Sequence, residues 1–357
     1  MKLIHCADLH LDSPLRTHMT KEQARLRNAE LIHSFLRLTR YAREQQVRVV
    51  LIAGDLFDGE RVKARTVDEV LEAIRDTPDT DYLYLPGNHD NATHAFSDHA
   101  LPANLKRFPT RWETFDYGEV AISGIEMTGD NAEALYDSLP SVPDRLHIVT
   151  LHGQISTRCG IDQVNATLLR NRGIHYLALG HLHSYHLEQL DATGVYCYPG
   201  CLEGRGFDEC GEKGFVLLET KHGRLDAQFV PFACRQLFRV PVDITGRSKN
   251  PEVLKEMEAQ TAGIRGEDMV EFVLTGAGDP TSDLAIPYLE KMLRSRFFFS
   301  KIKDESRLAL EPRDYKNDVS LKGAFIRQVL ASELPEADKA AVIRVGIAAL
   351  TGEDIPL

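Results

Sequence analysis

VRVVLIAGDLFD, residues 47–58, carries the strongest indication of fold in this chain. Its first seven residues form an apolar run, which is typical of a strand buried on both faces of a sheet. Gly54 and Asp55 follow directly, at the point where such a strand ends. Because sites in α/β sheets form beyond the carboxyl ends of the strands, Asp55 is a candidate functional residue.

Four further apolar runs end in the same way, with side chains that bind metals. These are Asp8 and His10 in IHCADLH (4–10), Asn88, His89 and Asp90 in LYLPGNHD (83–90), His152 in IVTLHGQ (148–154), and His181 and His183 in LALGHLH (177–183). In an α/β fold, the carboxyl ends of strands can lie together even when the strands are more than a hundred residues apart in the sequence. We therefore expect these side chains to meet in one cleft.

The residue types in this set predict a metal centre. Imidazole, carboxylate and amide ligands without thiolate argue against a structural zinc site and favour Mn²⁺, Fe or a catalytic Zn²⁺. Seven of these nine residues are the candidate ligands: Asp8, His10, Asp55, Asn88, His152, His181 and His183. Seven exceed what one ion needs and suit two ions that share a carboxylate, for which Asp55 is the natural choice. Two ions about 3.5–4 Å apart would clamp a phosphoryl group and generate a bridging hydroxide.

The first two thirds of the chain read as an α/β sandwich that finishes in antiparallel strands. Expected strands are 2–7, 47–53, 81–85, 111–116, 119–125, 145–151 and 175–179, and expected helices are 20–46, 63–76, 130–138 and 162–172. The stretch 184–230 is expected to be rich in strands.

The pattern changes after Pro231, and the metal-binding motifs do not recur. Expected strands are 236–244, 268–276 and 296–302, and expected helices are 251–260, 283–294, 318–331 and 335–350. We therefore predict two domains, 1–234 and a smaller α+β domain, 235–357. The last helix is apolar enough to pack within this chain or to dock on a partner.

The composition limits the classes of partner and location. The formal net charge of −11 is unusual for a protein that holds DNA by non-specific phosphate contacts. Either the substrate is small, or basic residues cluster locally, or a partner supplies the grip. The chain has no apolar run of the roughly 20 residues that a membrane span needs. Its start lacks the apolar core of a signal peptide, which predicts a cytoplasmic protein with reduced cysteines.

The ordered set D-x-H, G-D, G-N-H-D, H and G-H-x-H resembles the calcineurin-like metallophosphoesterase family. The resemblance implies a four-layer α/β/β/α sandwich and a binuclear metal centre. Asp8, His10, Asp55 and His183 would hold the first metal, and Asp55, Asn88, His152 and His181 the second. His89 would then be the catalytic histidine, which protonates the leaving oxygen or stabilises the transition state and is oriented by Asp90.

A narrower resemblance, to the SbcD-type and Mre-type DNA repair nucleases, rests on IHCADLHLDSPL (4–15), VLIAGDLFD (50–58) and YPG (198–200). It implies an Mn²⁺-dependent DNA exonuclease and endonuclease with an SMC-like or Rad-type ATPase partner. Whether the chain forms a homodimer is left open by the sequence. The domain after residue 234 would cap the site and select DNA ends. The acidic charge supports an alternative, a phosphodiesterase or phosphatase acting on a small nucleotide or a phosphoprotein. A third hypothesis is an assembly subunit with a vestigial metal site.

Several residues remain open between a functional and a structural interpretation. Asp12 either orients a metal ligand or caps the turn at Ser13-Pro14. Basic residues of the helix 20–46 either grip DNA phosphates or form a solvated face, which is the simpler interpretation. The basic residues of this helix are Arg25, Arg27, Arg37, Arg40 and Arg43. For four histidines, solvation or packing is a simpler interpretation than a role in the site: His18, His94, His99 and His186.

Overall fold

The structure is a computed structural model that describes residues 1–15, 19–59, 62–90, 96–97, 99–221, 223–278, 284–308, 315 and 317–351. These residues form two compact units, Met1–Gln236 and Leu237–Leu357. None of the described helices combines the length and the apolar character that crossing a membrane requires.

The first sheet of unit Met1–Gln236 has six strands in the order β14-β13-β1-β2-β3-β4. Its centre is parallel, and β13 and β14 add an antiparallel edge. The strands are β1 (Lys2–Cys6), β2 (Val49–Ala53), β3 (Asp81–Leu85), β4 (Leu105–Arg107), β13 (Gly214–Lys221) and β14 (Arg224–Pro231). Because β1, β2 and β3 are parallel, their carboxyl ends lie together at one end of the sheet.

The second sheet also has six strands, in the order β11-β12-β10-β7-β6-β5. They are β5 (Glu113–Tyr117), β6 (Val120–Gly124), β7 (Leu146–His152), β10 (Tyr176–Gly180), β11 (His186–Gln189) and β12 (Val195–Tyr198). In the parallel pair β7 and β10, Gly180 lies opposite His152. The block that contains His181 and His183 therefore begins beside His152.

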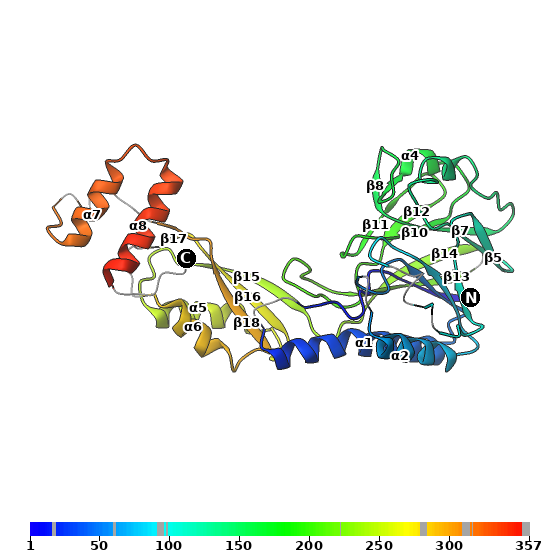
Figure 1. Cartoon of the computed structure of the whole chain (residues 1–357), viewed down its shortest axis with the longest axis horizontal. Coiled ribbons are helices and arrows are strands. Elements are labelled where there is room, and N and C mark those ends of the chain that lie inside the picture. The colour runs from blue at the N-terminus through cyan, green and yellow to red at the C-terminus, as the bar shows by residue number, and fades with distance from the viewer. Residues whose placement is uncertain are drawn as a thin grey trace. The chain divides into compact units, whose positions relative to one another are not determined.

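Helices cover the outer faces of the two sheets. One apolar core joins the outer face of the first sheet to α1 (Lys21–Glu44) and α2 (Ala64–Arg75), which lie along one side of this unit (Figure 1). A second core fills the space between the sheets, and a third covers the second sheet with the short helices η1 (Ala134–Tyr136) and α4 (Ala166–Leu169). The predicted four-layer α/β/β/α sandwich is confirmed.

Local sequence explains where the sequence-based prediction failed. The expected helix 162–172 is wrong in its first part, because Gln163–Asn165 forms strand β9, which pairs with β8 (Gln154–Ser156). Asn165 then acts as a helix N-cap, since its side chain accepts a hydrogen bond from the Thr167 amide. Only the single helical turn Ala166–Leu169 remains.

The second unit contains a parallel sheet, β15-β16-β18, with strands Leu237–Asp243, Met269–Thr275 and Phe299–Asp304. The helices α5 (Asn250–Gln260) and α6 (Ile286–Leu293) pack on it around Val270 and Phe272. A short pair, β17 (Ala277–Gly278) and β19 (Arg307–Leu308), precedes α7 (Leu321–Leu330) and α8 (Glu336–Thr351). On α8, Ile343 packs against α7 while Val342 and Val345 are exposed.

Candidate metal centre

The chain turns sharply where the predicted ligands follow their strands. Eight non-glycine residues in the described part of the chain have positive φ, and four of them are Asp8, His10, Asp55 and His181, with φ of 53°, 44°, 52° and 105°. Left-handed backbone is costly for residues with a side chain and persists where the surrounding structure enforces it, often at functional sites. The strain is thus concentrated in the residues that the sequence singles out.

The predicted ligands form a buried floor and an accessible rim. Asp8, His10, Asp55 and His152 are buried, with between 0% and 4% of their surface exposed. Asn88 and His89 are exposed, and His181 and His183 are half-buried. Charged and imidazole groups on a floor closed to water, beneath a rim open to it, form a site that a substrate can reach.

One group of ligand atoms lies where the chain leaves β1, near Asp8, and β10, near His183. Atoms of Asp8, His10 and His183 lie within 4.8 Å of one another. The Nε2 atoms of His10 and His183 are 3.2 Å apart, and His10 Nε2 is 3.6 Å from Asp55 Oδ2. These are the four residues predicted to hold the first metal.

A second group shares Asp8 with the first and contains Asp55, which also approaches His10 of the first group. Atoms of Asp8, Asp55 and His152 also lie within 4.8 Å of one another. His152 Nε2 is 2.9 Å from Asn88 Oδ1 and 3.4 Å from Asp55 Oδ2. His181 belongs to neither group. Its ring lies edge-on to that of His152 at 5.5 Å, and its amide donates to both carboxylate oxygens of Asp8, at 2.9 and 3.1 Å.

His152 and His183 each use Nδ1 for a hydrogen bond to a neighbouring oxygen, which leaves Nε2 to bind a cation. His152 Nδ1 is 2.9 Å from the Ala53 carbonyl oxygen, so this nitrogen carries the proton and donates it. His183 Nδ1 likewise faces Glu209 Oε1 at 2.7 Å. Metal-binding histidines are typically fixed in this way, with the second nitrogen hydrogen-bonded to a carbonyl or carboxylate.

The electrostatics of the site favour a positive charge among these ligands. Burial raises the pKa of Asp8. Burial also opposes the charge on Asp55, but His152 and His10 outweigh it and lower the pKa of Asp55 to about 2. Burial disfavours a charged His152, yet the Asp55 carboxylate outweighs it and raises the pKa of His152 to about 9. A proton on His152 therefore does part of what a bound cation would do.

The residues fit two divalent cations. Buried carboxylates and facing imidazole nitrogens are unfavourable together unless a positive charge is shared among them. Asn88 Oδ1 and Asp55 Oδ2 converge on the same nitrogen of His152, which a common cation would satisfy. The assignment of individual residues to two metals stays a prediction, and the geometry brings all of them except the His181 ring within these two groups.

Gly54 and Gly87 allow this close approach. A Cβ atom at Gly54 would lie 2.0 Å from His152 Nδ1, and one at Gly87 would lie 2.2 Å from Asp55 Oδ1. Gly54 also has φ of +97°, a conformation that a side chain disfavours. Neither position has room for a side chain while the ligands keep their places.

We expect Gly54→Ala to weaken both the fold and Mn²⁺ binding, because His152 must move. The free energy of unfolding should fall by more than the about 1–3 kcal/mol that strained backbone alone costs. The matched control is Gly59→Ala, whose φ is +96° but whose Cβ would meet nothing within 4 Å. Urea unfolding and Mn²⁺ titration check both. Equal Mn²⁺ affinity in the two variants would contradict the packing argument.

Asp58, rather than Asp90, contacts the ring of the predicted catalytic histidine. His89 Nδ1 is 3.0 Å from Asp58 Oδ1. Asp90 instead accepts hydrogen bonds from the amides of Leu56, Phe57 and Gly87, at 3.2, 2.9 and 3.0 Å. Its carboxylate ties the loop of Asp55 to the loop of His89, and the orientation of the His89 ring by Asp90 stays a prediction.

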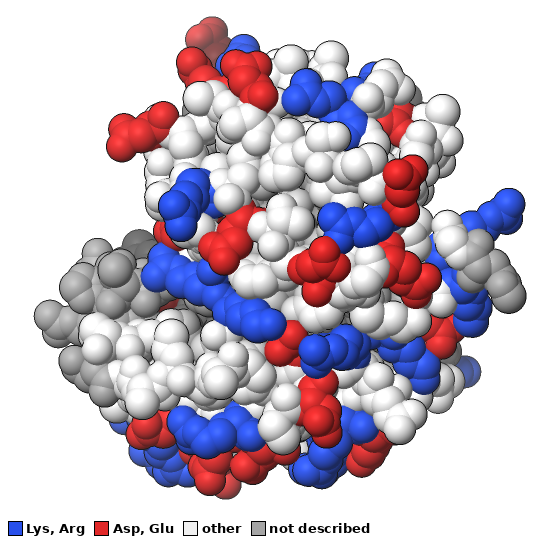
Figure 2. Space-filling model, turned by 90° about the vertical axis from the view of Figure 1, so that its right-hand side faces the viewer, with Lys and Arg blue, Asp and Glu red and all other residues white. Residues whose placement is uncertain are grey.

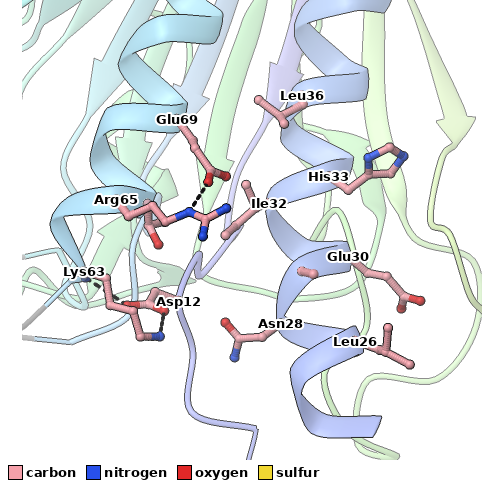
Figure 3. Close-up of a pocket in the computed structure, with 12 residues that line it drawn as sticks. Asp12, Leu26, Asn28, Glu30, Ile32, His33, Leu36, Lys63, Arg65 and Glu69 are labelled. Carbon is pink, nitrogen blue, oxygen red and sulfur yellow. Dashed lines mark hydrogen bonds and ion pairs between the residues drawn. The ribbon is translucent and has the colours of Figure 1, made fainter. Parts of the chain in front are cut away.

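The open residues have structural contacts. Asp12 accepts a hydrogen bond from the Lys63 amide at 2.9 Å and pairs with the Lys63 side chain, at the edge of a pocket between α1 and α2 (Figure 3). His99 pairs with Asp68, and His186 pairs with Glu188. His18 and His94 lie outside the described residues.

The basic face predicted for the first helix is divided. Arg25, Arg40 and Arg43 are exposed, as a solvated face requires. Arg27 is 1% exposed and donates to the Gly204 carbonyl oxygen at 2.6 Å, and Arg37 donates to Cys234 Sγ. These two arginines therefore anchor the chain after the GHLH block instead of facing solvent.

Sequence reasoning missed three charged residues of the site: Asp58, Arg205 and Glu209. Asp58 ends the GDLFD block and could have been found by its place beside Asp55. Arg205 and Glu209 lie in GRGFDE (204–209), which follows no apolar run and carries no periodic pattern. Only the folded chain brings them to His183.

Comparisons with known proteins agree with this geometry. Residues 1–185 match the family described as Calcineurin-like phosphoesterase. YhaO of Bacillus subtilis, named as an uncharacterized metallophosphoesterase, is 28% identical over 281 residues, which are 73% of this chain and 67% of that protein. The DNA double-strand break repair protein Mre11 of Aeropyrum pernix is 26% identical over 269 residues, which are 68% of this chain and 64% of that protein.

A further relative and a solved structure extend the comparison. Mre11 of Archaeoglobus fulgidus is 20% identical over 349 residues, which are 85% of this chain and 74% of that protein. The crystal structure of TT1561 of Thermus thermophilus has a TM-score of 0.44 and 13% identity, and the match covers 64% of this chain and 98% of TT1561.

Proposed function

The chain belongs to the calcineurin-like phosphoesterase family, hydrolases of phosphoester bonds that use a binuclear metal centre, and from this premise we propose that it is a DNA exonuclease and endonuclease. Mn²⁺ is the cation we propose for the site. The observation that carries the proposal is a pair of ligand groups that share Asp8 and are joined by Asp55, below the accessible Asn88 and His89.

Each part of the site has a distinct task in phosphodiester hydrolysis. Two divalent cations held there would polarise the phosphoryl group and lower the pKa of the attacking water. The buried floor keeps the ligands in place and excludes competing water. His89, whose side chain is 48% exposed, stands on the rim with Nδ1 fixed by Asp58, so its Nε2 can give a proton to the leaving oxygen.

The choice of DNA rests on the relatives named Mre11 and on the exposure of the rim residues. The rim residues Asn88 and His89 are exposed at the surface, as a site for a polymer requires. The net charge of −11 does not favour binding along a wide basic face. On the face that Figure 2 shows, basic and acidic side chains are intermixed rather than gathered into one basic field. We therefore expect the substrate to be held mainly by the metal centre and by a partner, an SMC-like ATPase.

The experiment is a substrate panel with the purified full chain and Mn²⁺, with and without a candidate ATPase. Linear duplex DNA, bis-p-nitrophenyl phosphate and cyclic nucleotides are compared, with Asn88→Ala as the inactive reference. The proposal expects Mn²⁺-dependent degradation of DNA that the reference lacks. Hydrolysis of the small esters with intact DNA under both conditions would overturn the DNA assignment and favour a small-nucleotide phosphodiesterase.

A further inference from the structure

A continuous series of charged groups connects the ring of His183 to the ring of His89. His183 Nδ1 is 2.7 Å from Glu209 Oε1, which accepts a hydrogen bond from Arg205 at 2.9 Å. The other end of the Arg205 guanidinium lies 3.7 Å from Asp58 Oδ2. Asp58 Oδ1 is in turn 3.0 Å from His89 Nδ1. One arginine thus stands between the carboxylates that hold a predicted ligand and the predicted catalytic histidine.

Arg205 occupies both oxygens of Glu209. Its side chain reaches Oε1 through Nε at 3.3 Å and through the terminal nitrogen, while its backbone amide donates to Oε2 at 2.7 Å. Glu209 is 5% exposed, so these hydrogen bonds are shielded from water. The low dielectric of a buried site strengthens them. The Glu209 carboxylate therefore has one orientation, with Oε1 directed at His183.

Ser13 bridges the Arg205 guanidinium and Asp58, with shorter distances than the direct 3.7 Å contact between them. Its hydroxyl accepts from Arg205 at 3.4 Å and donates to Asp58 Oδ2 at 2.6 Å. With Oδ2 held by Ser13, the second oxygen of Asp58 faces His89 Nδ1 at 3.0 Å and His10 Nδ1 at 3.4 Å. The Asp58 side chain is 16% exposed, so its orientation depends on these neighbours rather than on solvent.

The segment that carries Arg205 is itself fixed to the first helix. Arg27 holds the Gly204 carbonyl oxygen, and Ser34 donates to Glu203 Oε1 at 2.6 Å. Lys213, at the far end of the segment, donates to the His183 carbonyl oxygen at 2.6 Å. These anchors hold Arg205 in place relative to His183.

We propose that Arg205 is a positioning residue of this site: it fixes Glu209 so that His183 presents Nε2 to the first cation, and it supports Asp58 so that His89 presents Nε2 to the substrate. This inference rests on the proposed metal-dependent hydrolysis. Arg205 is turned inward, with 17% of its side chain exposed against 48% for His89, and its closest polar contacts are with Glu209. It therefore acts through its neighbours and does not bind the substrate.

Mn²⁺ affinity of the full chain, measured by calorimetry, tests the first half of the proposal without any substrate. Arg205→Gln should weaken Mn²⁺ binding by about 10- to 100-fold, the usual effect of losing an outer partner of a metal ligand. Arg205→Lys keeps the charge but not the fork and should recover part of the loss. The control is Arg107→Gln, which breaks the Arg107–Glu126 pair away from the site and should leave Mn²⁺ affinity unchanged.

Steady-state kinetics at saturating Mn²⁺ test the second half. Arg205→Gln should lower kcat while KM stays near the wild-type value, because His89 is misplaced but the substrate contacts persist. A raised KM with unchanged kcat and unchanged Mn²⁺ affinity would overturn the proposal and make Arg205 a substrate contact. If Arg205→Gln does not fold by circular dichroism, Glu209→Gln probes the same link and should give the same loss of Mn²⁺ affinity.

The outcomes separate this inference from the proposed function. A wild-type chain that binds two Mn²⁺ but hydrolyses no phosphodiester refutes the proposed function, while the affinity comparison between the variants still decides the role of Arg205. Wild-type Mn²⁺ affinity in both Arg205→Gln and Glu209→Gln refutes the inference, whatever the activity.

Discussion

Asp55→Asn is expected to abolish Mn²⁺-dependent phosphodiester hydrolysis. The Asp55 carboxylate approaches both His10 and His152, at 3.6 and 3.4 Å, so removing its charge disturbs both ligand groups. We expect activity to fall by at least about 10³-fold, because a two-metal clamp supplies both the nucleophile and the charge stabilisation. Initial rates with bis-p-nitrophenyl phosphate or DNA measure the effect.

Asp81→Asn provides the matched control for this variant. Asp81 is also a poorly exposed carboxylate on a strand of the first sheet, but it lies at the opposite end and pairs with Lys106 at 2.8 Å. Its replacement should reduce stability and leave the activity per folded molecule intact. Activity of Asp55→Asn within tenfold of wild type would contradict the bridging role.

His89→Gln is expected to lose catalysis while keeping the metals. The His89 ring lies on the rim beside His10, with ring centroids 4.9 Å apart, and its Nδ1 is engaged by Asp58. Loss of a positioned proton donor typically costs about 10²- to 10⁴-fold in rate. We expect that loss in kcat, together with two bound Mn²⁺ per chain by metal analysis.

His186→Gln is the control, because His186 has similar exposure, 45% against 48%, and likewise pairs with a carboxylate. It should retain wild-type kcat. If His89→Gln loses a metal ion as well as activity, the ring is a ligand, and its assignment as the proton donor is wrong.

The sequence predicted the sandwich and the gathering of ligands because both depend on local patterns. Each predicted ligand follows an apolar strand, so its position at the edge of a sheet is encoded within a few residues of itself. Gly54 and Gly87, which allow the close approach of His152 and Asp55, belong to the same local blocks as the predicted ligands. This explains why residues as distant as Asp8 and His183 could be assigned to one site.

The outer contacts could not be predicted, because they depend on how loops are packed rather than on where strands end. Arg205 and Glu209 come from a segment without periodicity, and Arg27 comes from a helix on which Arg25, Arg40 and Arg43 face solvent. The choice between Asp58 and Asp90 as the partner of His89 is decided by side-chain direction. Adjacency in the sequence favoured Asp90, and the folded loop favours Asp58.

Electron paramagnetic resonance of the full chain with two equivalents of Mn²⁺ tests the central claim most directly. Two ions bridged by Asp55 should give the spectrum of a spin-coupled pair in the wild type, and Asp55→Asn should give only isolated Mn²⁺. A wild-type spectrum of isolated, uncoupled ions at full occupancy would contradict a shared centre built by these strand ends.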